Sequence, residues 1–315
     1  MGVITTSSLS KSYGQVHALA DLTVDIGDGV TGLVGANGAG KSTLIKILLG
    51  LLEPTSGSAS VLGHDIGTGG QQIRQLVGYM PEHECLPPDV RCIDFVVHMG
   101  RMSGLPPAAS RERAADVLRH VGLAEERYRL MGGYSTGMKQ RAKLAQALVH
   151  DPQLVLLDEP TNGLDPAARD DMLGLVQRIG RDFGIPVLVT SHLMGELERI
   201  SDHVVVLDAG RLLRSEATRT FLADTGVVLV EVHAPAGAED PARAQHALGE
   251  ALAAAGLVCR PRGGLVEIDP DPSEGGHDRL RDLVRDTAAD LGIGLVRIQP
   301  QRGHLEDVFR EEVAP

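Results

Sequence analysis

Nine residues near the start of the chain carry the clearest chemistry. Residues 35–43 read Gly-Ala-Asn-Gly-Ala-Gly-Lys-Ser-Thr, which fits the phosphate-binding pattern G-x-x-x-x-G-K-[ST]. Gly35, Gly38 and Gly40 allow a tight turn whose N–H groups point at an anion, and a helix starting near Lys41 adds its positive dipole end. Lys41 supplies a full charge to the β- and γ-phosphates, and the Ser42 hydroxyl is placed to ligate Mg²⁺.

The segments on either side of this run fit the same chemistry. Residues 30–34 read as a short buried strand, and residues 44–50 read as a helix that Gly50 ends. The pattern requires this strand–loop–helix context, which a chance Gly-rich turn would lack. The sequence therefore predicts a nucleotide-binding loop between them.

Two acids follow a second apolar run. Residues 153–160 read Gln-Leu-Val-Leu-Leu-Asp-Glu-Pro, which predicts a strand buried on both faces with Asp158 and Glu159 at its carboxyl end. Because ligands of open α/β sheets bind at that end, Asp158 is placed to hold Mg²⁺ through water. Glu159 is placed to orient or deprotonate an attacking water. The alternative, two acids that cap a helix, fits poorly because Pro160 follows at once.

A histidine occupies the equivalent position on another predicted strand. Residues 186–191 read Pro-Val-Leu-Val-Thr-Ser, which predicts another buried strand, and His192 stands at its end. There the imidazole can hydrogen-bond a γ-phosphate, although by itself a satisfied surface histidine is the simpler interpretation. These positions require a parallel sheet that brings the strand ends together.

The rest of the first 225 residues is predicted to form that sheet and the helices packed on it. Residues 3–9 and 19–26 alternate as half-buried strands do. Tyr13 lies in the turn between them, where its ring can stack on a base or pack on its own sheet. Further strands are predicted at 58–62, 77–80, 204–208 and 211–214, and helices at 68–76, 167–183 and 216–226. Residues 84–150 have helical periodicity, which predicts a helical subdomain inserted into the α/β core.

Residues 226–315 form a second predicted domain. They read as strand (227–234), helix (240–255), strand (257–260), strand (265–269), helix (277–291) and strand (293–299), followed by a last helix at 304–312. The order βαββαβ predicts a small α+β domain of the ferredoxin-like type. It contains no catalytic constellation, so a structural or regulatory role is expected.

Composition narrows the possible partners. The net charge of −12 argues against nucleic acid as a main ligand, since phosphate backbones need a basic surface. Three cysteines fit a reducing compartment, and Cys85 and Cys92 show no metal-ligand spacing. No apolar run approaches the roughly 18 residues of a membrane span, and no signal segment opens the chain. Work at a membrane would therefore need a partner protein.

Together these residues resemble the ATP-binding subunit of an ATP-binding cassette (ABC) transporter, over about residues 3–215. The resemblance implies a P-loop NTPase core and a set of roles for particular residues. Tyr13 matches the adenine-stacking aromatic, Glu82 stands where the family has Gln, and His192 matches the switch histidine. Expected catalytic residues are Glu159, His192 and Lys41. Expected nucleotide contacts are Tyr13, Gly35, Asn37, Gly38, Ala39, Gly40, Lys41, Ser42, Thr43, Ser135, Gly137 and Asp165, and expected Mg²⁺ ligands are Ser42, Glu82 and Asp158.

Two departures from the family pattern point to a branch. The usual Leu-Ser-Gly-Gly-Gln signature reads Tyr-Ser-Thr-Gly-Met at residues 134–138, and Glu82 puts a negative charge where an amide is usual. With the run His-Leu-Glu-Asp-Val-Phe at 304–309, these variants resemble exporters of drugs, antibiotics and polysaccharides.

The resemblance also implies a mechanism and partners. Two cassettes would pair head to tail, with each ATP between one phosphate loop and the other signature helix; a homodimer is expected, and pairing with a different cassette stays open. A separate transmembrane permease would dock on the helical subdomain, with the loop after Glu82, and hold the chain at the cytoplasmic face of the membrane. Two alternatives remain: a soluble ABC ATPase acting on ribosomes or DNA, and a nucleotide-binding regulator without turnover. The single cassette and negative charge disfavour the first, and Glu159 with His192 disfavours the second.

Overall fold

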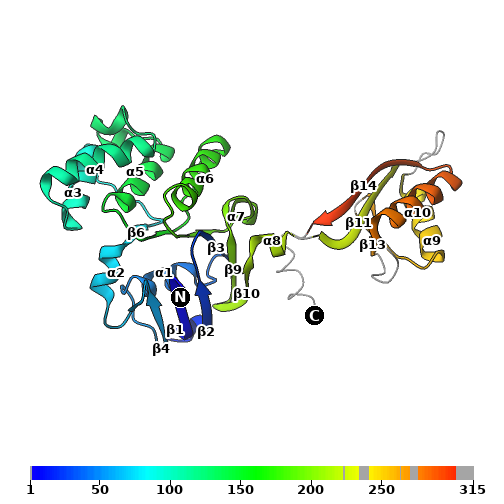
Figure 1. Cartoon of the computed structure of the whole chain (residues 1–315), viewed down its shortest axis with the longest axis horizontal. Coiled ribbons are helices and arrows are strands. Elements are labelled where there is room, and N and C mark those ends of the chain that lie inside the picture. Colours follow the sequence, from blue (N-terminus) through cyan, green and yellow to red (C-terminus); the bar gives the residue numbers. More distant parts are fainter. Residues whose placement is uncertain (1, 223, 234–240, 263, 270–275, 303–315) are drawn as a thin grey trace. The chain divides into compact units, whose positions relative to one another are not determined.

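A computed structural model describes residues 2–222, 224–233, 241–262, 264–269 and 276–302 (Figure 1). Packing contacts divide the chain into two units between Thr220 and Phe221, and each unit is considered by itself. The predicted boundary between residues 225 and 226 lies slightly later in the chain. It falls inside strand β11, which begins at Asp224.

A six-stranded sheet forms the centre of the first unit, in the order β10-β9-β3-β8-β7-β6. Five strands are parallel, and β10 pairs antiparallel with β9. Every residue of β3, β7 and β8 is buried, which explains their unbroken apolar sequences. The strands are β3 (Val30–Val34), β6 (Val77–Met80), β7 (Leu154–Leu157), β8 (Val187–Ser191), β9 (His203–Asp208) and β10 (Arg211–Ala217).

A second, antiparallel sheet has the order β2-β1-β4-β5. Its strands are β1 (Ile4–Tyr13), β2 (Val16–Ile26), β4 (Ser56–Val61) and β5 (His64–Asp65). The first two strands are longer than predicted and form a hairpin, because Tyr13 pairs with Val16 across a two-residue turn. Tyr13 therefore ends a strand, and its predicted position within a longer turn is wrong.

Helix α1 (Lys41–Leu48) joins the two sheets. Its buried Leu44, Ile45 and Ile47 belong to one apolar cluster that also contains Ile4 of β1 and Leu156 of β7. Burial of each such side chain contributes roughly 1.5–3 kcal/mol to the stability of the fold. The helix that begins at the phosphate loop is thus anchored in the core of the unit.

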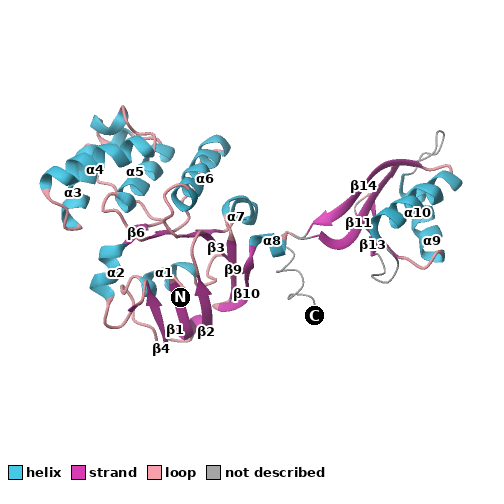
Figure 2. Ribbon diagram, viewed as in Figure 1, coloured by secondary structure: helices cyan, strands magenta, loops and turns pink. Residues whose placement is uncertain are grey.

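Three helices pack against one another within the range predicted for the helical subdomain (Figure 2). They are α3 (Cys92–Met102), α4 (Pro107–His120) and α5 (Thr136–Leu148), with short 3-10 turns at Glu126–Tyr128 and Met131–Gly133. The other helices of the first unit are α2 (Gly70–Leu76), α6 (Pro166–Arg181) and α7 (Met194–Ile200), and α8 (Thr218–Phe221) spans the division between the units. Helix α7 was not predicted, and α8 is shorter than the predicted helix at 216–226.

The second unit has the element order β11, α9, β12, β13, α10, β14. Their bounds are Asp224–His233, Pro241–Ala254, Val258–Arg262, Leu265–Asp269, Gly276–Asp290 and Gly294–Arg302. The sheet order is β12-β13-β11-β14, with every pair antiparallel. Alternate residues of β11 (Val228, Val230 and Val232) form an apolar core with both helices. The helix predicted at 304–312 lies outside the described residues.

Candidate nucleotide site

The phosphate loop connects the end of β3 to the start of α1. Gly40, just before the helix, has φ 103° and an added Cβ would lie 2.4 Å from the Ala18 carbonyl oxygen. Gly38 also has positive φ, at 88°. Only glycine adopts these conformations without strain, so the spacing of the motif follows from the path of the backbone.

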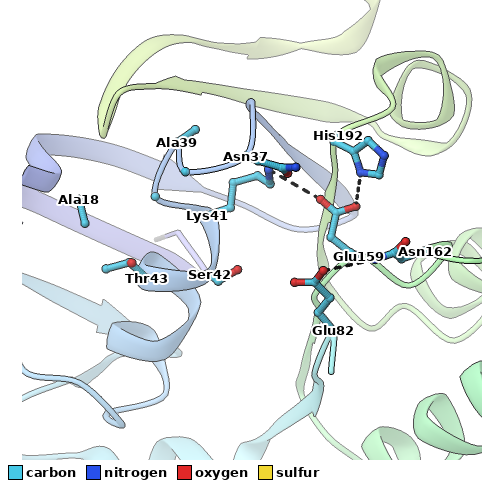
Figure 3. A pocket seen from close by; sticks show the side chains of 12 residues that line it. Ala18, Asn37, Ala39, Lys41, Ser42, Thr43, Glu82, Glu159, Asn162 and His192 are labelled. Carbon is cyan, nitrogen blue, oxygen red and sulfur yellow. Dashed lines mark hydrogen bonds and ion pairs between the residues drawn. The ribbon is translucent and has the colours of Figure 1, made fainter. Parts of the chain in front are cut away.

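A cavity of about 530 Å³ opens over this loop (Figure 3). The cavity brings together the phosphate loop, the loop after β6 and the ends of β7 and β8, as the parallel sheet predicted. Its lining residues are Ala18, Asn37, Gly38, Ala39, Gly40, Lys41, Ser42, Thr43, Glu82, Glu159, Asn162 and His192.

Glu159 is held by two basic side chains. His192 Nδ1 and Glu159 Oε2 share a hydrogen bond of 2.8 Å, and Lys41 Nζ lies 3.7 Å from Glu159 Oε1. Figure 3 shows Lys41, from the start of α1, and His192, just after β8, both directed at the carboxylate of Glu159. Lys41, only 6% exposed, also donates to the Gly35 carbonyl at 2.6 Å. An ammonium, a carboxylate and an imidazole in one cavity can bind a phosphate and deprotonate a water beside it.

The backbone at Glu159 is strained, with φ 50° in a non-glycine residue. The Glu159 N–H donates to Thr190 Oγ1 of β8 at 2.9 Å, which helps to hold this conformation. Strain of this kind costs on the order of 1–3 kcal/mol and clusters at active sites and ligand-binding positions. It points the carboxylate into the cavity.

Asp158 is nearly fully buried and does not itself line the cavity. Burial raises the pKa of its carboxyl group, Thr190 and Ser42 oppose that shift by hydrogen bonding, and the charges of Glu82 and Glu159 add to it. Thr190 Oγ1 donates to Asp158 Oδ1 at 2.9 Å, and the Ser42 hydroxyl donates to the same oxygen at 3.4 Å. A cation placed here would relieve the crowding of negative charge.

These oxygens fit Mg²⁺ as a partner of phosphates. In the described part of the chain, no three His, Cys, Asp or Glu side chains form a metal cluster. Mg²⁺ bound with substrate phosphates needs only one or two carboxylates, since waters and phosphate oxygens complete its shell. Ser42 and Asp158, adjacent through their hydrogen bond, match that requirement.

Sequence reasoning missed two polar residues near Glu82. The Asn162 side-chain amide donates to Glu82 Oε1 at 3.3 Å, and Lys143 Nζ donates to the Glu82 carbonyl at 2.9 Å. Asn162 follows the two acids by only a few residues, and that proximity was an available signal. Nothing in the local sequence distinguishes Lys143 from a surface lysine of a helix.

Gly35 does not line the cavity, although its carbonyl accepts from Lys41, and three predicted nucleotide residues from other elements also lie outside the lining. Ser135 caps α5 by accepting from the Met138 N–H at 3.3 Å, and Asp165 caps α6 by accepting from the Ala168 N–H at 3.0 Å. Gly137 lies beside α6, where an added Cβ would be 3.6 Å from Ala168 Cβ. These residues form a second group, from the signature helix and the loop before α6.

Tyr13 also lies outside the lining. Its side chain is 49% exposed at the end of β1, with Lys11 Nζ 5.4 Å from the ring centroid. An exposed ring at this position is available for stacking on a ligand.

Comparison with known proteins gives the family. The model of the ABC transporter family matches residues 19–162. A daunorubicin/doxorubicin resistance ATP-binding protein of Streptomyces peucetius, DrrA, is 33% identical, over 86% of this chain and 78% of its own length. The chain belongs to the ABC transporter family. It is an ATP-binding subunit with ATPase activity, as its sequence predicted.

Two further relatives place the ABC chain among known cassettes. The bacitracin transport ATP-binding protein BcrA of Bacillus licheniformis is 35% identical, over 67% of this chain and 68% of its own. The structure of cbiO1 from Clostridium perfringens, part of the ABC transporter complex cbiONQ, is similar to this chain with a TM-score of 0.64 and 26% identity. That match covers 70% of this chain and 90% of the other. In the described residues, no helix is both long and apolar enough to cross a membrane.

Proposed function

We propose that this ABC subunit powers export through a separate transmembrane subunit. The observation that carries the cassette pairing in this proposal is the division of the expected site into two groups. Lys41, Glu159 and His192 face the cavity, whereas Ser135 and Asp165 lie outside it. A second cassette, paired head to tail, would bring its own Ser135 and Gly137 against the ATP bound by the first. Binding would then close the dimer, and hydrolysis would open it.

Within each cavity the residues take separate roles. Lys41 neutralises the β- and γ-phosphates, and the phosphate-loop N–H groups bind their oxygens. Ser42 and Asp158 would hold Mg²⁺, with Glu82 as a further oxygen ligand. The metal would neutralise part of the phosphate charge. Glu159 accepts a proton from the attacking water, and His192 orients Glu159 and contacts the γ-phosphate. Tyr13 stacks on the adenine.

The transmembrane subunit would dock on a groove between the core and the helical subdomain. A cavity of about 200 Å³ lies there. Its lining residues are Leu49, Leu51, Arg74, Val77, Tyr79, Met99, Ser103, Gln146, Ala147 and His150. Leu51 is well exposed, as is Met102 at the end of α3. Exposed apolar side chains beside a groove favour a protein partner, which would hold the chain at the cytoplasmic face of the membrane.

The names of the relatives support export as the direction of transport. DrrA is named for drug resistance and BcrA for bacitracin transport. We therefore infer that the cargo of this transporter belongs to the class of drugs or antibiotics. The membrane subunit would select the individual cargo.

The second unit is proposed to be a ferredoxin-like domain over residues 226–315, following the cassette of residues 1–225. The support is its βαββαβ element order, with β11 and β13 at the centre of an antiparallel sheet. Its role would be structural or regulatory.

A pull-down from native membranes tests the transporter. The chain, tagged at its C-terminus, is extracted in mild detergent, and its co-purifying proteins are quantified. A polytopic membrane protein at near-equal stoichiometry supports the proposal. Recovery of ribosomal proteins or DNA instead would refute it in favour of a soluble ABC ATPase.

A further inference from the structure

One face of the signature helix α5 holds the loop that follows β6. Lys139, Lys143 and Gln146 stand at spacings of four and three residues, so they project from the same side of the helix. Lys139 pairs with Glu84 at 2.8 Å, and the Cys85 thiol donates to Gln146 Oε1 at 3.8 Å. Between them, Lys143 binds the backbone of the loop.

Lys143 is the buried member of this face, with 4% exposure. Its Nζ donates to the carbonyl of Glu82 at 2.9 Å and to that of His83 at 3.4 Å. Burial lowers the pKa of the Lys143 ammonium, whereas the nearby acids Glu84, Glu82 and Asp158 oppose that shift. An ammonium placed in a protein interior is costly unless it is well bonded. A methionine would fill the same space without that cost, so packing alone does not account for a lysine.

The side chain of Glu82 is held from the same helix by a second route. Asn162 donates to Glu82 Oε1, and Gln140 Nε2, from α5, donates to the Asn162 carbonyl at 3.1 Å. Gln140 is buried, one turn before Lys143. The backbone of Glu82 is therefore bonded directly to α5 through Lys143, and its carboxylate is linked to α5 through Asn162 and Gln140.

We propose that Lys143 is a positioning residue that fixes Glu82 in the nucleotide cavity and ties its position to the signature helix. The inference rests on the proposed function, in which the start of α5 binds the ATP of a second cassette. Movement of α5 as that contact forms is then transmitted through Lys143 to Glu82. Closure of the dimer would therefore be coupled to the placement of Glu82 in the cavity.

The test compares three variants of the full-length chain. Lys143→Met removes the ammonium at similar volume, Lys143→Arg restores charged donors, and Lys139→Met removes only the exposed ion pair on the same face. Steady-state phosphate release gives kcat and KM. A fluorescent ATP analogue reports nucleotide affinity, and hydrogen exchange of residues 81–86 reports the loop.

Lys143→Met is expected to lower kcat at least tenfold with nucleotide affinity within threefold of wild type. Nucleotide should no longer change the exchange of residues 81–86. Lys143→Arg should recover at least half of the lost activity on a logarithmic scale, and Lys139→Met should stay within twofold of wild type. If Lys143→Met does not fold, Lys143→Gln, a neutral and shorter donor, takes its place.

Three outcomes overturn the inference: a Lys143→Met kcat within twofold of wild type, a Lys143→Arg variant no better than Lys143→Met, or an undiminished response of residues 81–86 to nucleotide. A wild-type chain that shows no ATP-dependent dimer counts instead against the proposed function. The two failures are therefore distinguishable.

Discussion

Glu159→Gln separates hydrolysis from binding most sharply. The amide has the volume of the carboxylate, and its oxygen can still accept a hydrogen bond from His192 at the observed 2.8 Å. The cavity should therefore keep its shape. What disappears is the base that would take a proton from water, and a positioned general base contributes roughly 10²–10⁴-fold to a rate. We expect kcat to fall by that factor, equivalent to about 3–5 kcal/mol of barrier.

The same substitution should leave ATP binding intact or strengthen it. Lys41 Nζ lies 3.7 Å from Glu159 Oε1, with both side chains buried. At an effective dielectric constant of about 20, that attraction amounts to roughly 4 kcal/mol. In Glu159→Gln this attraction no longer competes with the phosphates for the ammonium of Lys41. ATP affinity should then equal or exceed that of the wild type, and the bound dimer should persist.

The assay combines phosphate release, ATP affinity and the mass of the species in solution with ATP. Glu196→Gln is a matched control, because Glu196 is equally buried and bonds Thr161 and Ser191 but does not line the cavity. Its kcat should fall much less than that of Glu159→Gln. A Glu159→Gln enzyme within tenfold of the wild-type kcat would refute Glu159 as the base. A monomer with ATP bound would refute the paired arrangement.

Three other predictions concern binding, packing and pH. Lys41→Ala should abolish measurable hydrolysis and weaken ATP binding at least tenfold by calorimetry; retained turnover would refute the phosphate-loop assignment. Gly78→Ala should lower the free energy of unfolding by about 2 kcal/mol in urea titrations, since its Cβ would lie 2.1 Å from the Ala147 carbonyl oxygen; Gly174→Ala, with open space, should not. Burial lowers the pKa of His150, so stability should be full above about pH 6.5 and decline as pH falls below it; His150→Gln should reduce this decline between pH 7.5 and 5.5, and an unchanged slope would contradict the assignment.

The parts of the fold that could be predicted from sequence are those set by local pattern. The glycines of the phosphate loop are required by backbone angles that only glycine adopts readily, and β7 is an apolar run because it is buried on both faces. Each signal lies within about ten residues of chain. The same local rules misplaced Tyr13. Alternation of polar and apolar residues ended the first predicted strand at residue 9, whereas backbone pairing with β2 continues the strand to Tyr13.

The contacts around Glu82 could not be predicted from local sequence patterns. Lys143 lies 61 residues from Glu82 in sequence, and Asn162 lies 80 residues away. Both become partners only when β6, α5 and β7 are packed beside one another. A lysine on a helix otherwise fits a solvated face, so its role depends on burial that no sequence window reveals.

The predicted site residues fall into two separate groups on one chain, so catalysis should depend on pairing of two chains. Residues that would receive ATP line one cavity, whereas Ser135 and Asp165 already cap their own helices. Capping fixes the N-terminus of α5 in the conformation that presents backbone N–H groups to an anion. Under the proposed pairing this surface is ready for the γ-phosphate of another chain's ATP, so turnover should rise steeply with protein concentration. A specific activity independent of concentration through the range of dimer formation would count against two cassettes sharing each ATP.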